Sequence, residues 1–176
     1  VRNFFLQKKC VFFELTGQKN EAGEPASVDH QIGNFRHAWR KAFNEEIDKP
    51  RDWDAAFYEL KKRTEAVVAA GSKIVLFIDE LPWLCTTNSR FYENLDQAWN
   101  ASFEAAQRVK LIVCGSAATW ILKKIIYARA GLSRRVTERI RLAPFTLAET
   151  REYLRYKRFD LTDETIVETY LMIGGI

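Results

Sequence analysis

The chain has 176 residues, of which 47% are hydrophobic and 13% aromatic, so it can bury a sizeable core and is not an intrinsically disordered protein. Its 27 basic and 23 acidic residues give a net charge of +4, which is compatible with nucleic acid or another anionic partner without requiring one. No apolar run is long enough for a membrane span, no secretory signal opens the chain, and the three distant cysteines suit a reducing cytoplasm.

The first third of the chain predicts one strand followed by two helices. An apolar run at residues 10–15, bounded by Gly17, is typical of a buried strand. A polar loop over residues 18–27 follows. Hydrophobic side chains then recur every three or four residues, which predicts amphipathic helices on either side of Pro50. The residues concerned are Ile32, Phe35, Trp39 and Phe43, and then Trp53, Phe57, Leu60, Thr64 and Val67.

Two further apolar runs predict strands that are buried on both faces. Residues 74–78 are hydrophobic without alternation, and residues 111–114 repeat this pattern before Gly115 and Ser116. A weaker strand is expected at residues 140–142. Helices are predicted at residues 95–106, at 120–128, from the capping box of Thr146 and Glu149 to residue 159, and at 163–173.

Strands that alternate with helices predict an α/β fold with a parallel sheet and helices on both of its faces. Ligands of such sheets bind at the carboxyl ends of the strands. Asp79 and Glu80 end one predicted strand, and Ser116 follows the next. These three residues are therefore the candidate site.

The acidic pair has a chemical interpretation and a structural one. In phosphoryl transfer, one carboxylate helps to hold Mg²⁺ while its neighbour orients or deprotonates the attacking water. Alternatively, Asp79 and Glu80 simply end a strand at the surface, and Ser116 caps the next helix. The two histidines, His30 and His37, lack a third ligand and do not predict a metal site.

Several segments together resemble the prokaryotic STAND-type P-loop ATPases related to AAA+, the archaeal-type ATPase family. Residues 73–84 resemble the Walker B segment and residues 111–121 the sensor-1 strand of that family. Residues 131–137 resemble its arginine-containing segment. Residues 142–147 resemble the strand that leads into its helical lid, and residues 170–176 the Gly-Gly turn of the lid.

The resemblance implies a three-layer P-loop NTPase-like fold, with the ATPase core at residues 1–145 and the start of a helical lid at 146–176. It implies ATP and Mg²⁺ as cofactors, with Asp79 as the carboxylate associated with the metal and Glu80 as the base that activates water. Ser116 would sense the γ-phosphate. Arg135, rather than Arg134, would stabilise the transferred phosphate in cis or in trans, although an ordinary solvated or ion-paired arginine is the alternative.

One family motif is missing. A P-loop ATPase needs G-x-x-x-x-G-K-[ST], and none of the eight glycines begins this pattern. The chain starts at Val1 rather than Met, and residues 1–6 resemble the tail of the helix that follows the phosphate loop. We therefore expect the loop and the first strand to lie upstream. In the family, that strand separates those near Ile140 and Leu111, so these two would pair directly or leave a gap.

The sequence thus predicts the core of an ATP-hydrolysing regulatory switch, inactive without its phosphate loop. The resemblance implies a protein partner or a C-terminal effector domain, and it leaves the oligomeric state open. One alternative is an interaction module that keeps the fold without catalysis. Another is a Mg²⁺-dependent nuclease using Asp79 and Glu80, which lacks further acidic or lysine partners at matching strand ends.

Overall fold

A computed structural model describes residues 1–104, 106–116 and 131–175 of the chain. The structure divides into two compact units, Val1–Val136 and Thr137–Ile176. The helix predicted at residues 120–128 lies outside the described residues. Within the described ranges, no helix has both the length and the apolar character needed to cross a membrane.

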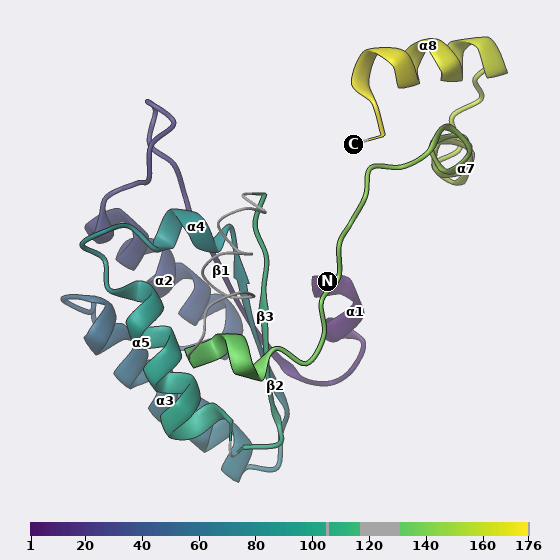
Figure 1. Ribbon diagram of the computed structural model, residues 1–176. Coiled ribbons are helices and arrows are strands. Elements are labelled where there is room, and N and C mark those ends of the chain that lie inside the picture. Colours follow the sequence, from purple (N-terminus) through teal and green to yellow (C-terminus); the bar gives the residue numbers. More distant parts are fainter. Residues whose placement is uncertain (105, 117–130, 176) are drawn as a thin grey trace. The chain divides into compact units, whose positions relative to one another are not determined.

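The first unit is built on a parallel sheet of three strands. These are β1 (Val11–Thr16), β2 (Ile74–Asp79) and β3 (Val109–Val113), in that order across the sheet (Figure 1). Ile74 of β2 lies opposite Val11 on one side and Val109 on the other. Each connection between consecutive strands contains helices, as parallel pairing requires. The predicted α/β fold with a parallel sheet is confirmed.

The central strand, β2, explains why its sequence lacks alternation. Its first five residues are all buried. Ile74, Leu76 and Ile78 belong to the larger hydrophobic core on one face of the sheet. Val75 and Phe77 belong to a smaller cluster on the other face. A strand covered on both faces needs apolar side chains at every position.

The larger core lies between the sheet and helices α2 (Val28–Phe43), α3 (Trp53–Ala69) and α5 (Phe91–Ala98) (Figure 1). Ser27 and Asp52 cap the starts of α2 and α3, since their side chains accept backbone N–H groups in the first turn. In the centre, the ring of Trp53 meets that of Phe91 edge-on, with centroids 4.6 Å apart. Edge-on packing is a favoured arrangement of buried aromatic rings.

The helix predicted at residues 95–106 has two parts. It begins as α5 and continues as a π-helical turn, η1 (Trp99–Phe103). The Glu104 N–H donates to the Trp99 carbonyl at 3.0 Å, which is the wider i→i+5 pattern of a π-turn. Hydrophobic spacing alone does not distinguish this turn from an α-helix, because both place Trp99 and Phe103 on neighbouring parts of one surface.

The opposite face of the sheet is covered by a short helix, α1 (Arg2–Leu6) (Figure 1). Phe5 of this helix stacks on Phe12 of β1 with ring centroids 6.0 Å apart, and Phe12 stacks on Phe77 at 5.9 Å. Helical residues therefore flank both faces of the sheet, as predicted.

The prediction of a strand at residues 140–142 is wrong. Residues 136–146 form no regular element, and Ile140 and Leu142 are 78% and 89% exposed. A three-residue strand forms only where a neighbour receives its backbone hydrogen bonds, and propensity alone does not supply one. In the described part of the chain, β3 pairs with β2 only, so the sheet has three strands rather than the four predicted.

The second unit contains two helices, α7 (Leu147–Tyr156) and α8 (Asp163–Ile173). The predicted capping box at Thr146 and Glu149 is confirmed, because each side chain accepts the backbone N–H of the other residue. Helix α7 ends three residues before the predicted end at residue 159. The backbone N–H of Phe145 donates to the Gly175 carbonyl at 2.7 Å, which closes this unit on itself.

Candidate functional site

The ends of β2 and β3 bring three of the four predicted site residues together. Asp79 is the last residue of β2, and Glu80 follows it directly. Ser116 lies three residues after the end of β3. Because β2 and β3 are parallel neighbours with Ile78 opposite Val113, both segments leave the sheet at the same edge.

Glu80 contacts Ser116 directly. The backbone N–H and the hydroxyl of Ser116 lie 3.3 and 3.2 Å from Oε2 of Glu80, and both donate to this carboxylate. The Leu81 N–H donates to the Cys114 carbonyl at 3.1 Å, which ties the two segments together at backbone level. The site is therefore held by both side-chain and main-chain hydrogen bonds.

The backbone of Glu80 is strained. Its φ of 47° and ψ of 44° lie in the left-handed region, which side chains other than glycine seldom occupy. Glu80 is also the residue from which the short helix α4 (Leu81–Leu84) begins. Such strain costs on the order of 1–3 kcal/mol and tends to occur at functional sites. Its position here directs the Glu80 side chain toward β3.

Asp79 is held by two donors that share one oxygen. The Glu80 N–H and the Cys114 thiol lie 3.0 and 2.7 Å from Oδ1. Burial, followed by the hydrogen bond to Asp79, raises the pKa of the Cys114 thiol to about 12. The thiol is thus protonated at neutral pH and donates its proton to the carboxylate.

Cys114 was not predicted as a site residue, because its contact with Asp79 follows only from the pairing of β2 with β3. The strand register pairs Ile78 with Val113, so the next residues along, Asp79 and Cys114, also face each other. Once the parallel pairing is known, a polar side chain at position 114 is expected to meet the carboxylate. The sequence by itself does not reveal that register.

Position 17 lies close to Glu80 in space and requires glycine. A Cβ placed on Gly17, just after β1, would lie 2.4 Å from the backbone oxygen of Glu80 and 3.0 Å from Cβ of Trp83. In the adjoining loop, the Lys19 ammonium lies 4.3 Å from the centre of the Trp83 ring. The loop after β1, which the sequence predicted, therefore packs closely on the Glu80 segment, and this packing was not predicted.

Arg135 does not join this cluster. It lies in the 3₁₀ helix η3 (Gly131–Arg135), and its Nε donates to Oε2 of Glu104 at 2.7 Å. Glu104 precedes β3, so this ion pair lies toward the amino ends of the strands, where η3, the short green helix, runs beside α5 (Figure 1). Arg134 is exposed.

The chemistry of the donor set fits a hard divalent cation at Asp79. In the described residues, the hydrogen bonds to this carboxylate all end on Oδ1, so Oδ2 is the oxygen that can face a metal or a metal-bound water. Mg²⁺ is commonly held through one or two carboxylates and several waters. Such a site needs no additional protein ligand from the described residues.

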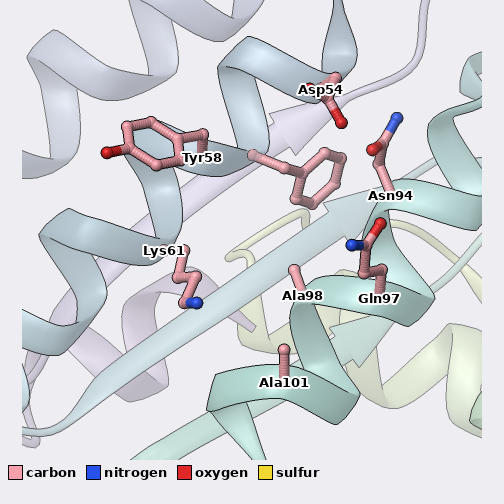
Figure 2. Close-up of a pocket in the computed structure, with 8 residues that line it drawn as sticks. Asp54, Tyr58, Lys61, Asn94, Gln97, Ala98 and Ala101 are labelled. Atoms are coloured by element: carbon pink, nitrogen blue, oxygen red, sulfur yellow. The ribbon is translucent and has the colours of Figure 1, made fainter.

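A separate groove of about 170 Å³ lies between α3 and α5 (Figure 2). Tyr58 and Lys61 line it from α3, and Asn94 and Gln97 line it from α5. None of its lining residues belongs to the Asp79–Glu80–Ser116 cluster.

Comparisons with known proteins show the fold. No family model matches the chain, and no curated protein matches it. Among solved structures, a Walker-type ATPase of Pyrococcus abyssi superposes with a TM-score of 0.57 at 15% sequence identity, over 98% of this chain and 54% of that protein. The chain therefore has a P-loop NTPase-like α/β fold and spans about half the length of this neighbour.

Proposed function

We propose that this chain is the core of an ATP-hydrolysing switch protein of the STAND/AAA+ type. One observation carries the proposal: Glu80 accepts two hydrogen bonds from Ser116, and Asp79 lies beside them at the same edge of two parallel strands. A base, a carboxylate for a cation and a hydroxyl that can contact phosphate are the groups that nucleotide hydrolysis needs there. The structural likeness to a Walker-type ATPase supports the same conclusion.

In this proposal, Glu80 orients a water molecule and accepts its proton as the water attacks the γ-phosphate. The hydroxyl of Ser116 would have a second possible acceptor when nucleotide is bound. Its hydroxyl donates to Glu80 in the structure, and a γ-phosphate oxygen would compete for the same proton. Nucleotide binding would thereby release the Glu80 carboxylate toward water, which would couple hydrolysis to occupation of the site.

Asp79 would hold Mg²⁺ through Oδ2, directly or through water. The cation would neutralise negative charge on the phosphate oxygens. The Cys114 thiol and the Glu80 N–H keep Oδ1 occupied, so they orient the remaining oxygen.

The remaining parts of the site are also proposals. The 176 residues contain no phosphate loop, so residues outside them would supply it. The resemblance implies that the strand carrying this loop would lie beside β3, whose outer edge has no strand partner among the described residues. Residues 1–145 would form the core and 146–176 the start of a lid, acting on a protein partner or effector domain.

The test is ATP hydrolysis by the intact protein with Glu80→Gln. We expect phosphate release to be abolished while ATP binding, measured by titration with a fluorescent analogue, persists. Glu65→Gln is the matched control, because Glu65 is an exposed carboxylate on α3. Unchanged turnover in Glu80→Gln would remove Glu80 from the role of base. An intact protein that binds no ATP would favour the interaction module instead.

A further inference from the structure

Gln31 is a buried polar residue that belongs to no predicted motif. It lies in the first turn of α2, and only 2% of its surface is exposed. Its backbone N–H donates to the Ser27 carbonyl at 3.0 Å, so the capped start of the helix fixes its position. A buried amide is costly unless its polar atoms are satisfied, so its partners indicate what it holds.

The side-chain amide of Gln31 connects two separate segments of the site. Its Oε1 accepts the backbone N–H of Gln18 at 3.2 Å, and its Nε2 donates to the Gln18 carbonyl at 2.9 Å. The same Nε2 donates to the Trp83 carbonyl at 3.3 Å. One side chain thus binds the loop after β1 and the helix after β2.

These two segments flank the strained residue Glu80. Gln18 adjoins Gly17, whose Cα leaves no room for a Cβ against the Glu80 carbonyl. The Trp83 N–H donates to that carbonyl at 3.0 Å. A left-handed backbone at a non-glycine residue persists only where its surroundings hold it in place. The contacts of Gln31 with Gln18 and Trp83 therefore tie the loop that packs on the Glu80 carbonyl to the helix that follows Glu80.

We propose that Gln31 is a positioning residue, whose amide holds the backbone of Glu80 in the conformation that directs its carboxylate to the reacting water. The catalytic part of this inference rests on the proposed function, whereas the restraint on residues 79–85 does not. Loss of the amide would let the Glu80 segment relax. Displacement of a catalytic group by about 1 Å can lower a rate by up to about 100-fold.

The variant that tests this is Gln31→Met in the intact protein, because methionine has nearly the same shape but no amide. Asn94→Leu is the matched control. Asn94 is also a buried amide, 6% exposed, and it donates at 2.9 Å to the backbone carbonyl of Arg90, the N-cap residue of α5. Both variants lose one buried amide, but only Gln31 contacts the Glu80 segment.

We expect Gln31→Met to lower kcat by about 10-fold to 100-fold with KM for ATP changed by less than about twofold. Backbone hydrogen exchange of residues 79–85, measured by mass spectrometry, should accelerate. Asn94→Leu should leave both kcat and this exchange near wild type. Equal kcat in the two variants, or unchanged exchange at residues 79–85, would overturn the inference.

A second variant and the exchange measurement separate the possible outcomes. If Gln31→Met does not fold, Gln31→Glu retains the acceptor for the Gln18 N–H and removes both donated hydrogen bonds, so the same changes are expected. If the wild-type protein hydrolyses no ATP, the proposed function fails. The exchange measurement then still decides whether Gln31 restrains the Glu80 segment.

Discussion

The hydroxyl of Ser116 lies 3.2 Å from the carboxylate of Glu80, across the ends of two neighbouring parallel strands. These residues are 36 positions apart in the chain. The Ser116 N–H donates to the same carboxylate oxygen at 3.3 Å, so a group that competed for the hydroxyl proton would remove one of two hydrogen bonds from Glu80.

Ser116→Ala removes the hydroxyl that would sense the γ-phosphate and hold Glu80. Loss of one donor of this kind costs about 100-fold or more in kcat when it acts in the transition state. We expect such a loss in phosphate release from the intact protein, with ATP affinity changed far less. Ser116→Thr keeps the hydroxyl and should restore most of the rate. Full activity in Ser116→Ala would exclude the sensing role.

The Cys114 thiol predicts a change of stability with pH. Its pKa is raised from 9.0 to about 12 in the folded chain. The folded state therefore keeps this proton more tightly than the unfolded state. The resulting stabilisation is fully present below pH 9 and is lost as the pH rises toward 12. We expect the urea midpoint to fall over this window more steeply in the wild type than in Cys114→Ser. Identical slopes would contradict the raised pKa of the Cys114 thiol.

Gly17→Ala places a methyl group 2.4 Å from the Glu80 backbone oxygen. Overpacking of this kind costs about 1–3 kcal/mol, and we expect a loss of that size in the free energy of unfolding. Gly33→Ala is the control, since a Cβ there meets no atom within 4 Å. Within helix α2 it should instead stabilise the chain by about 0.5–1 kcal/mol. Denaturant titration measures both, and equal effects would refute the close approach at Gly17.

The left-handed backbone of Glu80 predicts a difference in stability between two variants that lack the carboxylate. Glu80→Ala and Glu80→Gly both lose the carboxylate, but only glycine adopts a φ of 47° without strain. We expect Glu80→Gly to be the more stable of the two by about 1 kcal/mol, measured by urea unfolding. This order is the reverse of the one expected in a helix. Greater stability of Glu80→Ala would show that the backbone is not strained there.

The elements with strong local patterns were predictable. Residues 74–78 have five apolar side chains in succession, which only a strand covered on both faces tolerates, and the carboxylates that follow had to lie at its end. The capping box at Thr146 was equally predictable, because the residues that form its hydrogen bonds lie within four positions of one another. The expected strand at residues 140–142 failed because strand formation depends on a neighbour that the local sequence does not specify.

The sequence by itself determined the three strands of the sheet, the helices α2, α3 and α5 between them and, through the strand ends, the place of Asp79, Glu80 and Ser116. Local hydrophobic patterns indicate which segments are buried and where they end. Only the tertiary structure decided that Cys114 meets Asp79, that Gln31 binds both Gln18 and Trp83, and that Arg135 pairs with Glu104. These contacts join residues 13 to 52 positions apart through strand register and helix packing. Such contacts have no local signal, because the free energy that selects them comes from packing the whole core.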